Sequence, residues 1–278
     1  MMKKLKKMPF FLLLFVRYSF IMLWNISWGK VVFVGEIIAV VSGKGGTGKT
    51  SICAGVATAL AEAGEKVLCI DCDVGLRNLD ISLGISELNA LSFLDVSEGG
   101  YSLSAATTHP DYPQLSFLTA PVSCTPEQIN LHDFHQMLRK ARREFDFIFL
   151  DAPAGVDTGL RLTARDADRV ILVTGAEPAA IRDAGRTGQV LELMGKENVR
   201  LIVNRVRPKM ISAMALTVDD VMDDAGLPLL GVVPEDENVV LSAAFSKPLL
   251  RCSRRGAAAA CRRIAKRLQG RMVALPTK

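Results

Sequence analysis

The stretch Gly43-Lys44-Gly45-Gly46-Thr47-Gly48-Lys49-Thr50 decides the fold, because it matches the phosphate-binding pattern G-x-x-x-x-G-K-[ST] in full. Residues 36–41 before it form an apolar run typical of a buried strand, and residues 51–63 after it form an Ala-rich helical segment that stops at Gly64. Glycines let successive backbone N–H groups turn toward a polyphosphate, and the following helix presents its positive dipole end to the same charge. The sequence therefore predicts a site for a nucleoside triphosphate between this strand and this helix.

The lysines and the hydroxyl of this loop have separate expected roles. Lys49 is expected to reach the β- and γ-phosphates, and the Thr50 hydroxyl is expected to hold Mg²⁺. Lys44 is a second lysine just inside the pattern. The predicted nucleotide-binding residues of this stretch are Gly43, Lys44, Gly45, Gly46, Thr47, Gly48, Lys49, Thr50 and Ser51.

Short apolar runs recur between helical patterns along the chain. About seven strands are predicted, at residues 36–41, 66–70, 115–119, 145–150, 169–173, 199–203 and 229–233. Candidate helices between them include residues 126–143, with Leu131, Phe134 and Leu138 on one face, and residues 179–194. This alternation predicts an α/β fold, a single-domain P-loop NTPase whose mostly parallel sheet is covered by helices on both faces. Ligands of such sheets bind at the carboxyl ends of the strands.

Three carboxylates follow two of the predicted strands. Asp71 and Asp73 come directly after residues 66–70, and Asp151 ends the apolar run 145–150 in the manner of a Walker B strand. Two nearby acids can divide the work, one in the water shell of Mg²⁺ and one polarising the attacking water. The alternative is a solvated loop with aspartates that cap helices.

Composition places few limits on function. The 278 residues are 49% apolar and 23% charged, as in a globular protein. The net charge of +5 comes from residues 1–34, which hold six basic residues and no acid, so the rest is almost neutral and charge alone indicates no polyanionic partner.

The six cysteines are scattered and predicted to be free thiols. Cys69 and Cys72 form a C-x-x-C, but strand geometry turns residues three apart to opposite faces.

Residues 1–34 form a basic and apolar extension. Its uninterrupted apolar run, residues 10–16, is far shorter than the roughly 20 residues of a spanning helix, and no A-x-A-like cleavage site follows. Two interpretations stay open: a membrane anchor, or sequence upstream of a natural start near Val34. We favour the second, because the first strand begins at Glu36 and requires nothing before it. The expected organisation is the extension 1–34, an ATPase domain 35–272 and a short tail 273–278.

Four motifs together resemble the ParA/MinD family of deviant Walker A ATPases, and its MinD branch in particular. They are Lys44–Thr50, Ile70–Asp80, Asp151–Gly155 and Val233–Asp236, and the resemblance covers about residues 36–270. The run G-L-R-N-L-D at Gly75–Asp80 discriminates best, because ParA partition ATPases usually show a D-P-Q-G-type sequence there. The resemblance implies a slow, partner-stimulated ATPase that acts in division-site placement.

The same resemblance implies roles for individual residues. Two subunits would sandwich two ATP molecules, with Lys44 reaching the phosphates of the opposite subunit and Lys49 those of its own. Asp73 would activate water, and Asp71 and Asp151 would form the magnesium environment.

The resemblance also implies a site for the base. The segment Asn204-Arg205 would contact adenine, and Pro234, Glu235 and Asp236 would flank it. Without the resemblance, the alternative is that Asn204 is a turn residue whose side chain is bonded locally.

Partners and location follow only from the resemblance. It implies an ATP-dependent homodimer, a MinC-like inhibitor, a MinE-like activator, and a cytoplasmic protein that contacts the inner face of the membrane through a C-terminal amphipathic helix. Pro276 leaves little room for that helix, and the Ile264, Leu268 and Met272 stripe is expected to pack on the sheet.

Two other functions within the same superfamily stay open. The eight basic residues without an acid in the run 251–271 motivate a DNA partition ATPase of ParA type. A flagellar-number or polar localisation ATPase of the same superfamily is the further alternative.

Overall fold

The computed structural model describes residues 34–74, 76–122, 124–207, 209, 213–214 and 217–275. They belong, except for Val34, to one unit that spans Gly35–Lys278. The predicted extension 1–34, apart from Val34, and residues 276–278 of the predicted tail lie outside the described residues.

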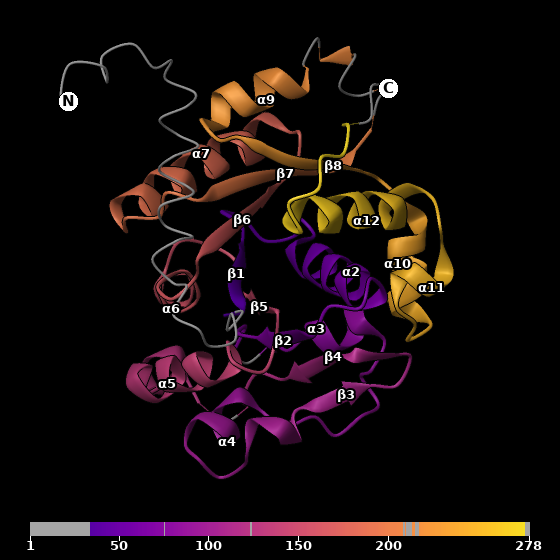
Figure 1. Cartoon of the computed structure of the whole chain (residues 1–278). Coiled ribbons are helices and arrows are strands. Elements are labelled where there is room, and N and C mark those ends of the chain that lie inside the picture. The colour runs from indigo at the N-terminus through magenta and orange to yellow at the C-terminus, as the bar shows by residue number, and fades with distance from the viewer. Residues whose placement is uncertain are drawn as a thin grey trace, which may run out of the picture. The chain divides into compact units, whose positions relative to one another are not determined.

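An eight-stranded sheet forms the centre of this unit, in the order β3-β4-β2-β5-β1-β6-β7-β8 among the described residues (Figure 1). Neighbouring strands run parallel, except that β3 pairs antiparallel with β4 at one edge. The strands are β1 (Glu36–Val41), β2 (Val67–Asp71), β3 (Thr107–His109), β4 (Tyr112–Leu118), β5 (Phe147–Asp151), β6 (Arg169–Thr174), β7 (Val199–Val206) and β8 (Leu229–Pro234). The predicted mostly parallel α/β sheet is confirmed.

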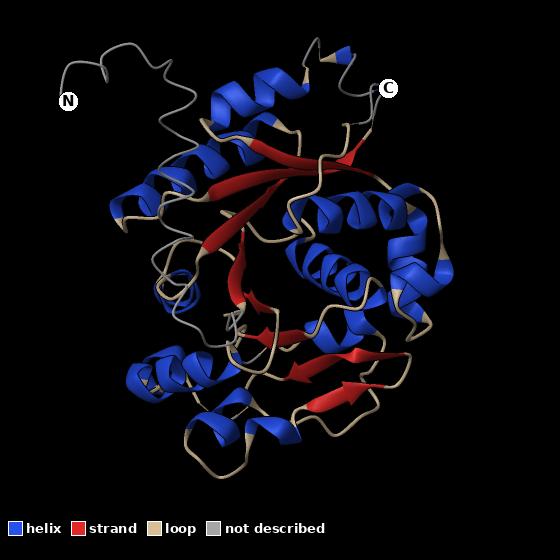
Figure 2. Ribbon diagram, viewed as in Figure 1, coloured by secondary structure: helices blue, strands red, loops and turns tan. Residues whose placement is uncertain are grey.

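Helices cover both faces of the sheet (Figure 2). One face carries α2 (Lys49–Glu62), α3 (Leu79–Leu83), α10 (Glu237–Ala244), α11 (Leu249–Cys252) and α12 (Gly256–Leu268). The other carries α4 (Phe93–Ser97), α5 (Leu131–Ala141), α6 (Thr158–Ala164), α7 (Pro178–Leu193) and α9 (Val218–Ala225). Two 3-10 turns, η1 (Leu103–Ala105) and η2 (Pro126–Gln128), lie in the connections.

Burial on both faces explains why the strands are apolar along their length. Every residue of β2 and of β5 is buried, and in β1 Ile37 and Ile38 enter different core clusters on opposite faces. A strand covered on both sides has no solvated face and needs no alternation of polar residues. Cys69 and Cys72 likewise belong to opposite cores, so the predicted separation of this C-x-x-C is confirmed.

The strand order brings distant segments to one edge of the sheet. β2, β5 and β1 are neighbours, and Asp71 and Asp151 are register partners at the carboxyl ends of β2 and β5. The phosphate loop leaves β1 beside them, while β7 and β8 carry Asn204 and Pro234 on the other side of β1, beyond β6. The predicted site residues from five strands therefore share the edge where such folds bind ligands.

One strand was not predicted, and the bounds of others differ from the prediction: β4 begins at Tyr112 rather than at residue 115, and β7 runs to Val206 rather than to residue 203. The short edge strand β3 is missing from the prediction, because Thr107-Thr108-His109 contains no apolar run. β5 begins at Phe147 rather than at residue 145. The Asp146 carboxylate before it accepts the N–H of Lys66 at 2.8 Å, which holds the residue before β5 against the residue before β2.

The helix predicted over residues 126–143 is interrupted. The turn η2 ends at an extended Ile129, and Asn130 then caps α5 by accepting the N–H of His132 at 3.0 Å. Leu131 consequently lies in the first turn of α5 and is 45% exposed, whereas Phe134 and Leu138 on the same helix face are buried.

Candidate functional site

The phosphate loop enters α2 through a glycine that no other residue can replace without strain. Gly48 has a left-handed φ of 84° and supplies no side-chain cap to the helix. A Cβ at this position would collide with Nδ2 of Asn204. The first N–H groups of α2 are thus left without a side-chain acceptor, which suits the binding of an anion.

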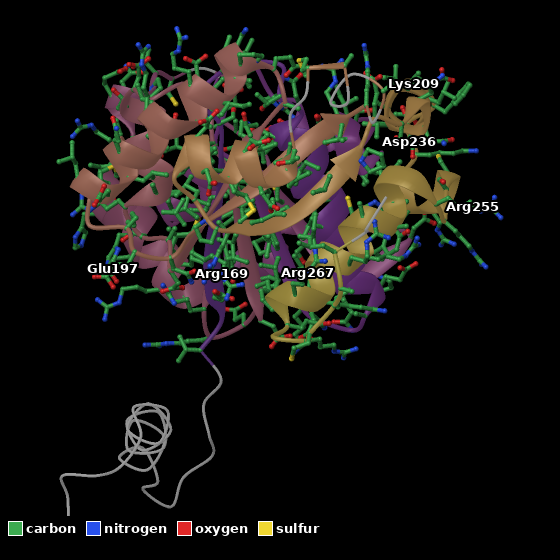
Figure 3. The ribbon with its side chains drawn as sticks, turned by 90° about the horizontal axis from the view of Figure 1, so that it is seen from above. Arg169, Glu197, Lys209, Asp236, Arg255 and Arg267 are labelled. Atoms are coloured by element: carbon green, nitrogen blue, oxygen red, sulfur yellow. The ribbon has the colours of Figure 1, made fainter. Side chains whose placement is uncertain are left out.

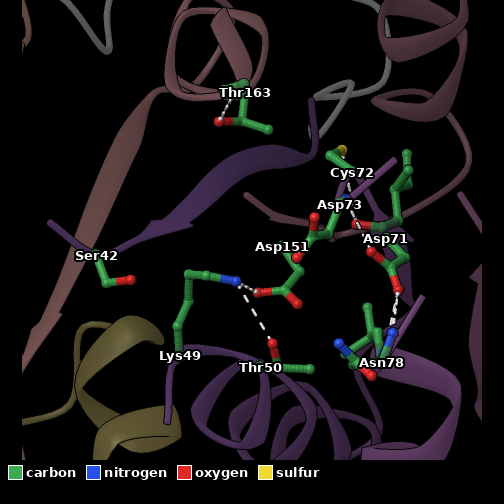
Figure 4. Close-up of polar contacts among 12 residues, drawn as sticks. Ser42, Lys49, Thr50, Asp71, Cys72, Asp73, Asn78, Asp151 and Thr163 are labelled. Atoms are coloured by element: carbon green, nitrogen blue, oxygen red, sulfur yellow. Dashed lines mark hydrogen bonds and ion pairs between the residues drawn. The ribbon is translucent and has the colours of Figure 1, made fainter. Parts of the chain in front are cut away.

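Lys49 is buried in the first turn of α2, and its ammonium faces the end of β5 (Figure 4). Its Nζ donates to Asp151 Oδ1 at 2.8 Å and to Thr50 Oγ1 at 3.4 Å. The two side chains of the ion pair are 7% and 1% exposed. The Asp151 carboxylate thus keeps the buried Lys49 charge paired in the absence of a phosphate.

The oxygen atoms around Lys49 suit Mg²⁺. The Thr50 hydroxyl and the Asp151 carboxylate converge on one ammonium, and Mg²⁺ in nucleotide sites takes one or two protein oxygens together with phosphates. Burial raises the pKa of Asp151, while the Lys49 charge acts against that rise. In the part of the chain that the structure describes, no three His, Cys, Asp or Glu side chains form a preassembled metal cage. Thr50 and Asp151 therefore fit the predicted magnesium role.

Asp71 is buried and holds the loop that follows β2. Its Oδ1 accepts the N–H of Asp73 at 2.9 Å, and its Oδ2 accepts those of Asn78 and Leu79 at 3.1 Å each (Figure 4). Burial and the charge of Asp151 raise the pKa of Asp71 to about 6, against the effect of these donors. Asp71 thus anchors Asp73, Asn78 and Leu79, a role that was not predicted from the sequence, while its part in the magnesium environment stays a prediction.

Asp73 is half-buried near Asp151 (Figure 4). Burial raises its pKa, the Lys49 ammonium lowers it, and the charge of Asp71 raises it further. A carboxylate with a raised pKa accepts a proton from water more readily. The surroundings of Asp73 are therefore compatible with the predicted water-activating role.

Lys44 has the opposite setting from Lys49. Its side chain is exposed, and its ammonium makes no hydrogen bond or ion pair with any described residue. The backbone carbonyl of Lys44 accepts a hydrogen bond from the Ser42 hydroxyl at 3.0 Å. The second lysine of the loop is thus free to meet a group outside this chain.

Asn204 and Arg205 reach the phosphate loop from β7. Asn204 is 6% exposed, and its Nδ2 donates to the carbonyl oxygen of Thr47 at 2.8 Å. The Arg205 guanidinium donates from Nη1 to the carbonyl oxygen of Gly46 at 3.2 Å. The alternative of a locally bonded turn at Asn204 is therefore wrong, and the adenine contact of this segment stays a prediction.

Glu235 links two arginines beside the end of β8. It accepts two hydrogen bonds from Arg207, one of them from Nη2 to Oε1 at 2.6 Å, and Nη2 of Arg205 lies 3.6 Å from the same oxygen. Arg207 was not predicted from the sequence. Strand alternation gave no signal for it, because Arg205 and Arg207 lie beyond the predicted strand 199–203 and Arg205 has a left-handed φ of 55°.

Asp236 caps two helices at once. Its Oδ1 accepts the N–H of Asn238 at 3.0 Å at the start of α10, and its Oδ2 accepts the N–H of Ala257 at 2.9 Å at the start of α12. Pro234 is the last residue of β8. That Pro234, Glu235 and Asp236 flank the adenine base stays a prediction.

The basic run 251–271 is partly tied to the chain itself. Arg262 donates to Glu62 at 2.6 Å, Arg251 lies 3.3 Å from Asp111, and Arg267 donates to the carbonyl of Leu230 at 2.8 Å. The ion pairs of Arg251 and Arg262 reduce the positive charge available to a polyanion, and the bond of Arg267 to a carbonyl holds its guanidinium against the chain.

The last helix packs inward as predicted for Ile264 and Leu268, but the predicted place of Met272 on the same packed stripe is wrong. α12 contacts α2 and β8, and its residues Ile264 and Leu268 are buried, whereas Met272 lies after the helix and is fully exposed. Among the described residues, no helix has the length and apolar character needed to cross a membrane.

Known proteins resemble this chain over most of its length. The model of the CobQ/CobB/MinD/ParA nucleotide binding domain matches residues 38–249. The septum site-determining protein MinD of Bacillus subtilis is 34% identical over 253 residues, which cover 87% of this chain and 92% of that protein. MinD of Synechocystis is 36% identical over 219 residues, covering 78% and 82%.

Solved structures agree with these relatives. A chain of the MinC:MinD cell division protein complex of Aquifex aeolicus has a TM-score of 0.80 at 34% identity and covers 87% of this chain and 98% of its own length. MinD of Pyrococcus horikoshii complexed with Mg-ADP has a TM-score of 0.73 at 28% identity, covering 84% and 96%. The chain therefore belongs to the CobQ/CobB/MinD/ParA nucleotide-binding family and, within it, to the MinD septum site-determining ATPases.

Proposed function

We propose that this ATPase acts in division-site placement as a dimeric switch, which pairs across bound ATP and separates after hydrolysis. The observation that carries the proposal is the contrast between the two lysines of one loop. Lys49 is buried against Asp151, whereas Lys44 is exposed and has no partner among the described residues. One lysine thus serves the phosphates of its own chain, and the other is available to those of a second copy.

The side chains at the sheet edge divide the reaction between them. Lys49 exchanges Asp151 for the phosphates when nucleotide binds, because its charge must stay paired. Asp73 holds the attacking water and takes up its proton, helped by its raised pKa. Thr50 and Asp151 would hold Mg²⁺, which neutralises phosphate charge when bound. Asp71 fixes the loop on which Asp73 lies.

The finer part of the proposal concerns partners and location. We infer a MinC-like partner for the ATP-bound dimer, a MinE-like or other activator of slow hydrolysis, and peripheral contact of a cytoplasmic protein with the membrane. The MinC:MinD complex among the similar structures supports the first of these. Sedimentation of the full chain with anionic liposomes tests the membrane part. Equal sedimentation with ATP, with ADP and without nucleotide, at the level of a liposome-free control, would remove it.

The relatives favour this function over DNA partition. MinD of Bacillus subtilis and MinD of Synechocystis both exceed 30% identity, whereas a ParA family ATPase of Chlorobium tepidum has 22% identity and shows the fold alone. The internal contacts of Arg251, Arg262 and Arg267 weaken the charge argument for DNA as well.

Hydrolysis by a Lys44 variant tests the proposal. We expect the full chain to release phosphate slowly from ATP with Mg²⁺, and Lys44→Ala to lose this activity and ATP-dependent pairing. Because the Lys44 ammonium has no partner among the described residues of its own chain, the melting temperature should not change. Lys140→Ala removes an exposed lysine of α5 and serves as the control. Wild-type turnover in Lys44→Ala would contradict the assigned role.

A further inference from the structure

Two consecutive residues of β7 hold two consecutive carbonyls of the phosphate loop. Asn204 Nδ2 donates to Thr47 O at 2.8 Å, and Arg205 Nη1 donates to Gly46 O at 3.2 Å. β7 is separated from β1, the strand that carries the loop, by β6. The two side chains therefore connect the loop to a strand that lies two positions away in the sheet.

Fixing these carbonyls also fixes the N–H groups that follow them. A trans peptide is planar, and its C=O and N–H point in opposite directions. The bond to Gly46 O therefore sets the direction of the Thr47 N–H, and the bond to Thr47 O sets that of the Gly48 N–H. Backbone N–H groups are the donors by which such a loop binds phosphates.

The contact is built closely and is not a chance approach of surface side chains. The Asn204 side chain is buried, and a Cβ on Gly48 would collide with its amide nitrogen. Arg205 holds a left-handed φ of 55°, which is uncommon for a residue other than glycine. Its second nitrogen, Nη2, lies 3.6 Å from Glu235, so the guanidinium is held on both sides.

We propose that Asn204 and Arg205 are positioning residues of the phosphate loop, and that they support phosphate binding whether or not a base is present. An amide carries two N–H donors and one carbonyl acceptor. Asn204 uses one donor on Thr47 O and keeps one donor and its Oδ1 for a base. The same side chain thus links the base and phosphate halves of the site. This inference rests on the proposed nucleotide function.

Inorganic tripolyphosphate separates this role from a contact with the base. Its affinity for the full chain, measured by calorimetry beside that of ATP, should fall about tenfold in Asn204→Ala, the change expected for one hydrogen bond worth about 1.4 kcal/mol. Arg205→Ala, which alters a half-exposed side chain, should lower it similarly. A melting curve without ligand checks that each variant is folded.

Two controls sharpen the result. Arg200→Ala removes the same charge from an exposed position at the start of β7 and should leave tripolyphosphate affinity within about twofold of wild type. At higher salt, the loss in Arg205→Ala should persist, since a fixed hydrogen bond is screened less than a distant charge. In Asn204→Ala and Arg205→Ala, kcat at saturating ATP should fall much less than kcat/KM.

The outcomes are distinguishable. Variants that bind tripolyphosphate like wild type but lose ATP affinity would overturn the positioning role and leave a base contact alone. A loss in Arg200→Ala equal to that in Arg205→Ala would overturn it too, because only net charge would then matter. If wild type binds neither ATP nor tripolyphosphate, the proposed nucleotide function fails together with the inference.

Discussion

Lys49 and Asp151 form the buried charge pair on which the site is built. Each is almost inaccessible, and their atoms lie 2.8 Å apart. A pair of this kind adds little net stability compared with apolar residues, yet the loss of one partner leaves the other charge buried and uncompensated. The pair therefore links phosphate binding to the stability of the nucleotide-free protein.

This link gives a prediction for a pair of variants. Lys49→Met should abolish ATP binding and lower the free energy of unfolding at pH 7 by about 3 kcal/mol, because Asp151 is left without its partner. The double variant Lys49→Met, Asp151→Asn should recover most of that stability but no binding. Urea unfolding and ATP titration check both parts. Equal stability of wild type and Lys49→Met would show that the pair does not have this role.

His109 gives a prediction about pH. Its ring is buried, with Nε2 2.8 Å from Leu83 O and Nδ1 accepting the N–H of Asp111 at 3.0 Å, so the neutral form fits the site. Burial lowers the pKa of His109, so as the pH falls below its ordinary 6.5 the unfolded chain takes up a proton first and stability is lost.

The His109→Gln variant isolates this effect. It should be less stable than wild type by about 1–3 kcal/mol at pH 8, since buried polar partners are left unpaired. The difference should shrink as the pH falls below 6.5, because only wild type has this titrating group. Urea unfolding at several pH values measures it, with the exposed His132→Gln as control. A difference that is constant with pH would contradict the assigned effect of His109.

At the scale of elements, Asp236 holds two helix starts together. It accepts one N–H at the start of α10 and one at the start of α12. Asp236→Ala should lower the free energy of unfolding by about 1–2 kcal/mol, since each lost cap costs about 1 kcal/mol. Asp236→Asn, whose amide keeps one of the two acceptor oxygens, should lose about half of that.

Denaturant unfolding measures these losses, and Glu197→Ala at an exposed position away from Asp236 is the control (Figure 3). If Asp236→Ala and the control have the same stability, Asp236 does not cap both helices, and its carboxylate is left for the predicted place beside the base.

Most elements could be predicted from the sequence because their signals are local. The strands buried on both faces are continuous apolar runs, and the loop 43–50 requires a strand before it and a helix after it. The edge strand β3 was missed because its pairing with β4, and not its composition, makes it a strand. The start of α5 was misplaced because a single cap at Asn130 decides it.

For the whole molecule, the residue types of the site could be predicted, but their contacts could not. Asp71, Asp73 and Asp151 were expected at one edge because parallel strands end together. The hydrogen bonds of Asp71 to backbone N–H groups depend on distances that only the folded chain sets. The same holds for the hydrogen bond from Asn204 to Thr47 O, which joins residues 157 positions apart. Sequence spacing holds no information on such pairings.

Pairing across ATP is the property of the whole molecule on which the proposed switch depends. Asp73→Ala should bind ATP and pair but fail to hydrolyse, because Lys44 and Lys49 are unchanged while the water-activating carboxylate is gone. The ATP-bound dimer of Asp73→Ala should therefore persist long enough for its molar mass to be measured.

The most direct test is the molar mass of full-length Asp73→Ala, measured by light scattering during gel filtration with Mg²⁺ and either ATP or ADP. We predict two chain masses with ATP and one with ADP, and one chain mass with ATP when Lys44→Ala is added. The same mass with ATP and ADP, or pairing that survives Lys44→Ala, would contradict the claim that this protein is an ATP-dependent dimeric switch.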